Sequence, residues 1–302
     1  MRMLTVGTSD FKARVRAVAF AAVCVASGCA TAGLMLKVDT WTLDERLRVV
    51  LGGGGNSTVM VAGRDVTVTD VKFGPAARRL RHGLEVDLGH RVRQVMLTHA
   101  HWDHAAGLTQ FANANAVWVH PNARRALERE GVRAPFVDVH SQVRIWVGDE
   151  DVRLMHVGVG HTDGDLVAFL PKRRLLIAGD VLNNGFEPFG DPAYGGDIAQ
   201  FRTTVQALLA LDFDTVIPGH GDVMPRAAVE RRLAYLTSLE DAVQEALRAG
   251  WTEDVAAQRI TLDDYDDLKP MFPLVTRAKN VRALYRAFAN HSAKVQVDAG
   301  PH

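Results

Sequence analysis

Short apolar segments, separated by glycine and polar residues, recur through the middle of the chain and predict β-strands. Residues 57–62 and 66–71 are two alternating segments joined by Gly63-Arg64-Asp65, a spacing typical of a β-hairpin. Further strands are expected at residues 95–97, 116–119, 143–147, 152–157, 166–170, 175–178 and 215–217. Four glycines at residues 52–55 precede the hairpin. Because no Lys-Ser or Lys-Thr pair follows them, we expect a turn there rather than a phosphate-binding loop.

Segments with helical spacing lie among and after these strands. They cover residues 75–88, 121–130 and 198–211, followed by two long amphipathic patterns at 226–249 and 275–289. Because the helices do not strictly alternate with the strands, the pattern predicts a layered α+β fold. The acidic stretch 263–267 lacks the glycine and the distal glutamate of a calcium loop, so we expect a solvated loop or helix start.

The first 32 residues have the layout of a secretory signal. Four basic residues precede an apolar stretch at residues 17–26, and small residues follow up to Ala32. The apolar stretch is too short to span a bilayer as a stable helix. A buried N-terminal helix is the less favoured alternative. We therefore expect a signal peptide at residues 1–32, a main domain at 33–225, and C-terminal helices and a tail at 226–302 packed on the same domain.

Two processing sites compete at the end of this segment. The sequence Ala-Ser-Gly-Cys that ends at Cys29 resembles the site where bacterial lipoproteins are cleaved, although Ala26 replaces the usual leucine. The sequence Ala-Thr-Ala that ends at Ala32 would instead serve an ordinary signal peptidase and release a soluble protein. Both sites predict export to the periplasm, and lipid anchoring at Cys29 is favoured over release.

Composition narrows the chemistry further. With 47% hydrophobic and 23% charged residues, the chain is typical of a soluble globular protein. Its formal net charge of zero gives no reason to expect nucleic acid as a partner. The only two cysteines, Cys24 and Cys29, lie in the predicted signal. The mature chain therefore has no internal disulfide and no thiolate ligand, and any metal site must be built from histidine and carboxylate.

Histidine and aspartate concentrate in the run His99-Ala100-His101-Trp102-Asp103-His104, which directly follows an apolar segment. Imidazole and carboxylate are ligands that zinc accepts, and a compact cluster closes around a metal at little cost in chain entropy. Three more candidates each stand at the end of an apolar segment: His161, Asp180 and His220. Loop residues at strand ends can converge on one cleft, so the seven side chains together predict two metal sites.

From residue 52 to residue 221 the chain resembles the metallo-β-lactamase superfamily. The resemblance rests on the H-x-H-x-D-H run and on the Gly-His, Gly-Asp and Gly-His pairs that end at His161, Asp180 and His220, in this order. It implies a four-layer αβ/βα metallo-β-lactamase sandwich, with a dimetal site at one edge of the sheets. In this chain a C-terminal helical extension would follow the sandwich.

The resemblance also implies how the ligands divide between two zinc ions. One ion is expected on His99, His101 and His161, and the other on Asp103, His104 and His220, with Asp180 bridging the two. Asp70 matches a family aspartate that supports the ligand loops, as ligating histidines commonly require. Asp163 and Asp165 are expected to be turn residues. Iron or manganese would also suit a site of histidine and aspartate.

The expected mechanism follows from the two metals. Two ions about 3.5–4 Å apart can share a water and lower its pKa towards neutrality. The resulting hydroxide would attack a carbonyl or phosphoryl centre while one ion stabilises the developing oxyanion. Asp103, a ligand and proton acceptor together, is the candidate catalytic residue that orients the hydroxide. No serine or cysteine nucleophile is required, and the chain contains no G-x-S-x-G sequence.

Departures from subfamily patterns narrow the activity. Asp180 stands where the typical β-lactamases of the family carry cysteine or serine, and so resembles the glyoxalase-II-like and broader hydrolase branches. The basic C-terminal elements by which glyoxalase II holds glutathione are lacking. His101 stands where the iron-dependent redox branch usually has glutamate, which favours zinc hydrolysis. RNA-processing relatives carry a large inserted domain for which this chain has no room.

We therefore expect an exported dinuclear zinc-dependent hydrolase that uses a metal-bridging hydroxide on a small ester, thioester, lactone or amide. The alternatives are a β-lactamase proper and a non-catalytic metal-binding lipoprotein. The expected partner is a small-molecule substrate, with membrane attachment through the N-terminal lipid, and the sequence leaves the oligomeric state open. Four aromatic residues are expected either to line the substrate cleft or to pack in the core: Trp102, Phe186, Phe189 and Tyr194.

Overall fold

The structure is a computed structural model that describes residues 39–271 and 275–298, without the side chains of Trp41 and of residues 291–298. The predicted signal peptide and the candidate lipidation site Cys29 lie outside the described residues. Within the described ranges, no helix combines the length and the apolar character needed to cross a membrane.

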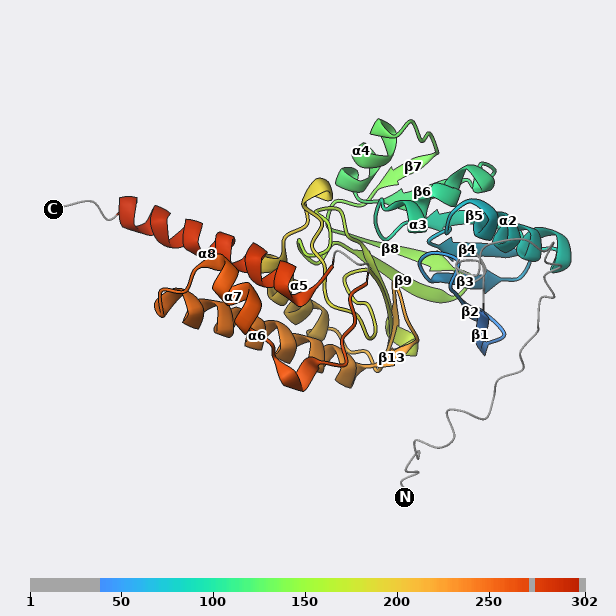
Figure 1. The fold of residues 1–302 in the computed structure, drawn as a ribbon. Coiled ribbons are helices and arrows are strands. Elements are labelled where there is room, and N and C mark those ends of the chain that lie inside the picture. Colours follow the sequence, from blue (N-terminus) through green and yellow to red (C-terminus); the bar gives the residue numbers. More distant parts are fainter. Residues whose placement is uncertain (1–38, 272–274, 299–302) are drawn as a thin grey trace, which may run out of the picture.

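Two mixed β-sheets form the centre of the molecule (Figure 1). The first sheet contains, in spatial order, β1 (Asp39–Asp44), β2 (Leu47–Leu51), β3 (Ser57–Ala62), β4 (Asp65–Thr69), β5 (Arg91–Met96), β6 (Ala116–Val119) and β7 (Phe136–Asp138). The strands β1 to β4 pair antiparallel, and β4 to β7 run parallel. The second sheet contains, in spatial order, β13 (Met224–Pro225), β12 (Thr215–Pro218), β11 (Leu175–Gly179), β10 (Val167–Leu170), β9 (Glu150–Met155) and β8 (Gln142–Val147). Its strands pair antiparallel except for β11 and β12, which are parallel.

Helices cover the outer faces of both sheets (Figure 1). Beside the first sheet lie α2 (Gly74–His82), the π-helical turn η2 (Gly83–Asp87), α3 (Trp102–Ala105), the 3-10 segment η3 (Ala106–Phe111) and α4 (Pro121–Arg129). Beside the second sheet lie α5 (Ile198–Leu209), α6 (Arg226–Arg248), α7 (Glu253–Arg259) and α8 (Arg277–Asp298). The shorter 3-10 turns are η4 (Pro171–Arg173), η5 (Pro192–Tyr194) and η6 (Asp263–Tyr265).

Three apolar clusters define the layers. Between the sheets, Met60 and Met96 of the first sheet pack in one cluster with Leu154 and Ile177 of the second. Another cluster joins the first sheet to α2 and α4, and a third joins the second sheet to α5, α6 and α8. The order of layers is therefore helices, sheet, sheet, helices. This confirms the predicted four-layer α+β sandwich.

Most predicted elements are present, with differences at their ends. The expected hairpin is formed by β3 and β4, which pair antiparallel. The helix expected at residues 75–88 becomes α2 followed by a π-helical turn, because Gly83 keeps a helical φ of −58° and the chain continues coiling. The strands β1, β2, β7 and β13 were not expected. The described side chains of β1 are exposed, and β7 and β13 have only three and two residues.

Candidate metal centre

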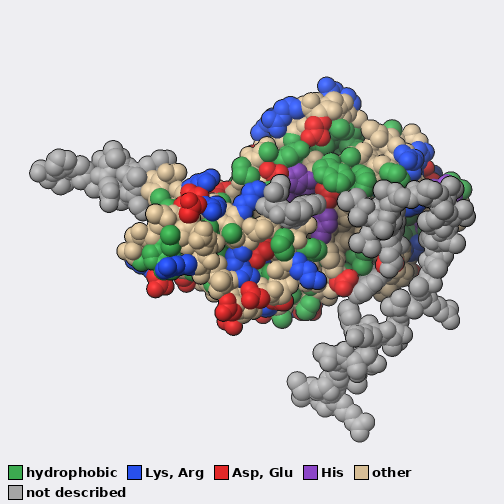
Figure 2. All heavy atoms as spheres, viewed as in Figure 1, with side chains coloured by type: hydrophobic (Ala, Val, Ile, Leu, Met, Phe, Trp, Pro, Cys, Tyr) green, Lys and Arg blue, Asp and Glu red, His purple; other side chains and the backbone are tan. Residues whose placement is uncertain are grey.

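All seven predicted ligands lie together at one edge of the sandwich. The run from His99 to His104 follows β5, and His161 lies in the loop between β9 and β10. Asp180 and His220 follow β11 and β12, which are parallel neighbours, so the carboxyl ends of both strands present their ligands to the same edge. Figure 2 shows histidine side chains gathered near the centre of the face that it views.

Three groups of side chains have ligand atoms within 4.8 Å of one another. They are His99, His101 and His161; His99, His104 and Asp180; and Asp103, His104 and His220. The first and the last group coincide with the two ligand sets that the family resemblance implies, and are called the first and second group below. The middle group places Asp180 between them.

The hydrogen bonds around His99 determine which of its ring nitrogens is free. Thr98 Oγ1 donates to Asp70 Oδ2 at 2.7 Å and lies 2.9 Å from His99 Nδ1. Because the hydroxyl proton is committed to Asp70, His99 Nδ1 must donate to Thr98, which leaves Nε2 with its lone pair. That Nε2 atom is buried and has no hydrogen-bond partner among the described residues. His99 is therefore oriented as a ligand through Nε2.

His101 and His161 complete the first group. Asp191 Oδ2 lies 3.1 Å from His101 Nε2, so Nδ1 is the atom of His101 that remains for a metal. His161 Nδ1 lies 3.6 Å from Asp165 Oδ1, beyond hydrogen-bond length, and His161 Nε2 lies 3.7 Å from Asp180 Oδ2. The rings of His99, His101 and His161 have centroids 4.5–4.8 Å apart.

In the second group, the Nε2 atoms of His104 and His220 and a carboxylate oxygen of Asp103 converge. His104 Nδ1 lies 2.8 Å from Asp70 Oδ2, so its Nε2 faces the centre. There it lies 3.3 Å from His220 Nε2, which is itself 3.1 Å from Asp103 Oδ2. Asp180 faces both groups: its Oδ1 is 3.1 Å from His104 Nε2, and its Oδ2 is 3.5 Å from His220 Nε2.

Burial and neighbouring charges set the protonation of the centre. Burial lowers the pKa of His99 well below its ordinary value, and burial together with His161 lowers the pKa of His101 to about 4. Burial would also lower the pKa of His220, but Asp180 and Asp103 raise it to about 9. Burial would raise the pKa of Asp180, yet His220 and His104 hold that pKa well below its ordinary value. The centre therefore presents ionised carboxylate where its donors converge.

These side chains fit divalent metal ions. Neutral imidazole nitrogen and carboxylate oxygen are donors that zinc, iron and manganese accept. His99 Nε2 and Asp180 Oδ1 are buried, and within the described part of the chain neither atom has a partner with hydrogen-bond geometry. Buried polar atoms are normally satisfied, so a bound cation would account for both. A metal cofactor is thus supported by the geometry and by the chemistry of the donor set.

Sequence reasoning missed Asp191 and the full role of Asp165. Asp191 contacts His101 from a loop after β11, and the pair Gly190-Asp191 repeats the Gly-Asp pattern of Asp180, a signal that could have found it. Asp165 accepts hydrogen bonds from Thr162 N and Oγ1, as expected of a turn residue, and in addition faces His161.

Two of the four aromatic candidates pack beside the proposed ligands. The Tyr194 ring packs edge-on against His101, with ring centroids 4.5 Å apart. The ring centroids of Phe189 and His161 are 6.1 Å apart. Trp102, between two ligands in the sequence, keeps 52% of its surface exposed and packs against Phe73. Phe186 instead forms a β-bridge with Lys269.

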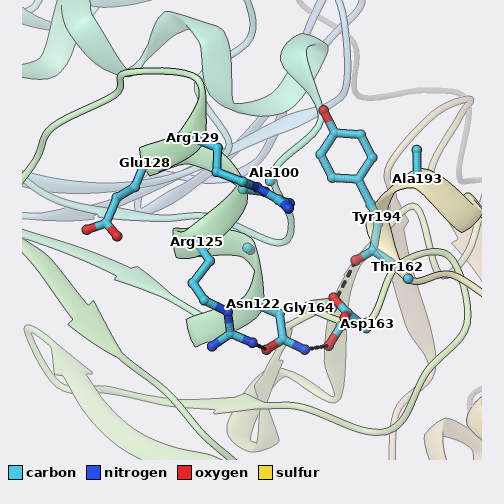
Figure 3. Close-up of a pocket in the computed structure, with 13 residues that line it drawn as sticks. Ala100, Asn122, Arg125, Glu128, Arg129, Thr162, Asp163, Gly164, Ala193 and Tyr194 are labelled. Carbon is cyan, nitrogen blue, oxygen red and sulfur yellow. Dashed lines mark hydrogen bonds between the residues drawn. The ribbon is translucent and has the colours of Figure 1, made fainter.

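A cavity of about 570 Å³ lies beside Tyr194, the ring that packs on His101, and none of the seven proposed ligands lines it (Figure 3). Ala100, which lies between His99 and His101, and Tyr194 line it towards the ligands, and Arg125 and Arg129 of α4 line it on another side. In Figure 3 the Arg129 side chain extends from α4 towards Tyr194, whereas Arg125 donates a hydrogen bond to Asn122 Oδ1. The wall that this cavity shares with His101 is therefore the Tyr194 ring.

Comparison with known proteins finds one matching family model and several relatives. The family model described as "Metallo-beta-lactamase superfamily" matches residues 50–220. "Metallo-beta-lactamase type 2" of Bacillus cereus is 25% identical over 150 residues, which are 48% of this chain and 58% of the relative. The chain thus spans less than two thirds of that relative. "2,4-dinitroanisole O-demethylase subunit alpha" of Nocardioides sp. (strain JS1661) is 24% identical over 241 residues, 76% of this chain and 66% of the relative.

Solved structures agree on the fold. A metallo-beta-lactamase from Pontibacter korlensis matches with a TM-score of 0.60 and 16% identity, covering 67% of this chain and 99% of that chain. The DIM-1 metallo-beta-lactamase matches with a TM-score of 0.59 and 18% identity, covering 67% and 98%. Because the family model matches more than half of the chain, and because the fold and the order of the H-x-H-x-D-H elements agree with it, this protein belongs to the metallo-beta-lactamase superfamily.

Proposed function

We propose that the protein is a dinuclear metal-dependent hydrolase, with zinc as its metal, that acts on a small ester, thioester, lactone or amide. The observation that carries the proposal is the position of Asp180 between two converging sets of donors. Its carboxylate lies 3.1 Å from His104 Nε2 in the second group and 3.7 Å from His161 Nε2 in the first. A carboxylate that faces both groups is suited to bridge two ions. Membership of the superfamily supports hydrolysis as the reaction type.

The chain's own residues would hold and orient the centre. Two divalent ions bound there would polarise a substrate carbonyl and lower the pKa of water towards neutrality. The first group would hold one ion and the second group the other, with Asp180 facing both. Thr98, Asp191 and Asp70 hold the ring nitrogens of His99, His101 and His104 that point away from the centre. Such partners fix the ring orientation of ligating histidines.

Asp103 is the proposed catalytic residue. Its side chain keeps 11% of its surface exposed, against 4% for Asp180, so it is the more accessible of the two carboxylates at the centre. Burial would raise the pKa of Asp103, but His104 and a hydrogen bond with His220 lower it. An ionised carboxylate at this position can orient an attacking water and accept its proton.

A hydrolysis panel of ester, thioester, lactone and amide substrates, run on the zinc-loaded protein, tests this proposal. We expect turnover of at least one class. In Asp103→Ala, with retention of zinc verified by metal analysis, we expect a fall of about 10²–10⁴-fold, because the proton acceptor is lost. The matched control is Asp222→Ala, which removes an exposed carboxylate two residues after His220 and should leave the rate unchanged. Equal rates in all three proteins would contradict the proposal. Bound zinc without any turnover would support the non-catalytic metal-binding lipoprotein.

β-Lactam hydrolysis is the second candidate function, and the names of the Bacillus cereus relative and of the solved structures favour it. Asp180, in place of the cysteine or serine of the typical β-lactamases, argues against it as the main activity. A chromogenic cephalosporin distinguishes the two: a rate no better than that of free zinc removes this candidate. Because one relative is named a 2,4-dinitroanisole O-demethylase subunit, that aryl ether belongs in the same panel.

A further inference from the structure

Lys72 is a completely buried lysine with an unusual set of partners. Its ammonium group donates to three backbone carbonyl oxygens, those of Val50 at 2.9 Å, Gly52 at 2.6 Å and Gly55 at 2.8 Å. An ammonium group has three donors, so the three carbonyls satisfy it completely. Lysine is almost never fully buried unless it is paired. The three carbonyl contacts are therefore what makes the burial of Lys72 possible.

The carbonyls belong largely to residues 52–56, called the glycine loop below, which connects β2 and β3. Gly52, Gly53 and Gly54 have φ values of +76°, +66° and +103°, a region that glycine enters freely. A chain of such residues is flexible, so its shape must be imposed by its contacts. Lys72 itself has φ +60°, which is uncommon for a residue with a side chain and persists only where the surroundings enforce it.

One side of the glycine loop packs directly against the second group. Gly55 N donates to the backbone oxygen of Asp103 at 3.0 Å. A Cβ atom on Gly55 would overlap the His104 ring, and one on Gly54 would crowd the backbone oxygen of Asp103. The loop therefore forms a close backbone wall behind His104 and Asp103.

The end of the glycine loop holds the segment around His220. Asn56 N donates to the backbone oxygen of Gly219 at 2.7 Å. Asn56 Nδ2 donates to the backbone oxygens of Pro218 and Gly221, both at 2.9 Å. The loop thus connects the two separate segments of chain that supply Asp103 and His104 on one side and His220 on the other.

We propose that Lys72 is a positioning residue for the second metal group: by tying the glycine loop to its ammonium group, it holds His104, Asp103 and His220 at the spacing that binds an ion. The inference rests on the proposed function only in requiring divalent ions at the centre, and it does not require hydrolysis. Loss of the Lys72 charge and loss of its positioning role predict opposite changes in metal affinity. Removing a buried cation near a metal site would by charge alone strengthen metal binding, whereas loss of positioning weakens it.

The test is zinc titration of the metal-free protein against a competing chelator, in wild type and in Lys72→Met, whose unbranched side chain is one heavy atom shorter and has no donor. We expect the first equivalent to bind as in wild type and the affinity for the second to fall about 10–100-fold. Lys72→Gln, which keeps two donors, should give a smaller fall. Asn56→Ala should reproduce the selective loss, because it releases the other end of the loop.

Val205→Ala is the control for general destabilisation, because Val205 is fully buried in the cluster around α5, outside the centre. It should lower the thermal midpoint and leave both affinities unchanged. Unchanged or stronger binding of the second equivalent in Lys72→Met would overturn the inference, as would failure of both Lys72 variants to fold. A wild-type protein that binds two ions and cleaves no substrate would instead remove the proposed function and leave this inference standing.

Discussion

Asp70 connects two of the proposed ligands through one buried carboxylate. Its Oδ1 accepts a hydrogen bond from Thr98 N at 2.8 Å, and its Oδ2 accepts from Thr98 Oγ1, which in turn faces His99. The same Oδ2 atom lies 2.8 Å from His104 Nδ1. Asp70 thereby orients one histidine of each group, which supports the role that the family resemblance implies for it.

We expect Asp70→Ala to destabilise the metal-free protein and to weaken zinc binding. The substitution leaves the backbone N–H of Thr98 without its acceptor, a loss of about 1–3 kcal/mol. It also frees the His104 ring, which should lower zinc affinity about 10–100-fold. Asp70→Asn keeps one acceptor oxygen and tolerates the left-handed backbone at φ +55°, so its losses should be smaller. Urea unfolding and zinc titration measure both effects, and equal losses in the two variants would contradict this role.

The seven ligands could be proposed from sequence because each stands in a short motif at the end of an apolar segment. Lys72 could not, since the carbonyl oxygens that it binds belong to residues 17–22 positions earlier and no local pattern marks it as buried. Asp191 is 90 positions from His101. Contacts over such separations exist only once the sheets are assembled, so a single sequence does not reveal them.

Close packing of neighbouring strand ends explains why a glycine precedes Asp180 and His220. Gly179 ends β11 with φ +52°, and a Cβ atom there would crowd the Thr98 side chain. A Cβ atom on Gly219, which follows β12, would overlap the Asp180 carboxylate. The pairs Gly179-Asp180 and Gly219-His220 therefore let two neighbouring strand ends approach closely enough for their proposed ligands to meet.

Strand and helix predictions succeeded where the apolar pattern decided the structure. The strands β10 and β11 are buried along their whole length and were expected from continuous apolar runs. The helix α7 was not expected, because it has only seven residues and begins with Glu253 and Asp254. Its N-terminus is capped by Thr252, whose Oγ1 accepts a hydrogen bond from Val255 N. A single threonine is too common in the sequence to mark a helix start by itself.

The helix α8 offers a test at the scale of one element. Leu284 is buried in the cluster that joins the second sheet to α5, α6 and α8, so Leu284→Ala should lower the free energy of unfolding by about 2–5 kcal/mol. Leu43→Ala, at an exposed leucine, should change it by less than about 0.5 kcal/mol. We propose that residues 226–302 belong to the same domain as the sandwich, and calorimetry should then show one transition. A separate early transition in Leu284→Ala would contradict that proposal.

At the scale of the whole molecule, two sheets packed face to face bring the ligand segments to one edge. The run that ends at His104 comes from the first sheet, and Asp180 and His220 come from the second. The centre therefore forms only when both sheets are in place, because its proposed ligands follow β5, β11 and β12 and lie in the loop between β9 and β10. The helices α6 to α8 gather on the side of the second sheet (Figure 1) and complete its outer layer.

We propose that the protein is exported and anchored in the membrane through a lipid on Cys29, which lies outside the described residues. In a bacterial host, wild-type protein should then sediment with membranes, with an N-terminus at Cys29 that carries the mass of the lipid. The Cys29→Ser protein should carry no lipid and should no longer sediment with membranes, because serine has no thiol to be modified. Wild-type protein found soluble in the periplasm, with its N-terminus at Gly33, would contradict anchoring and support cleavage after Ala32.

The hydrolysis rate, measured against the number of zinc ions bound per chain, tests most directly whether the seven donors form one dinuclear hydrolytic centre. The substrate for this measurement is one that the zinc-loaded protein hydrolyses in the panel described above. Metal-free protein should not hydrolyse it. The hydrolysis rate should reach its plateau when two zinc ions are bound per chain. Further zinc should add nothing. A plateau at one ion per chain, or two bound ions with no hydrolysis above that of free zinc, would contradict the account.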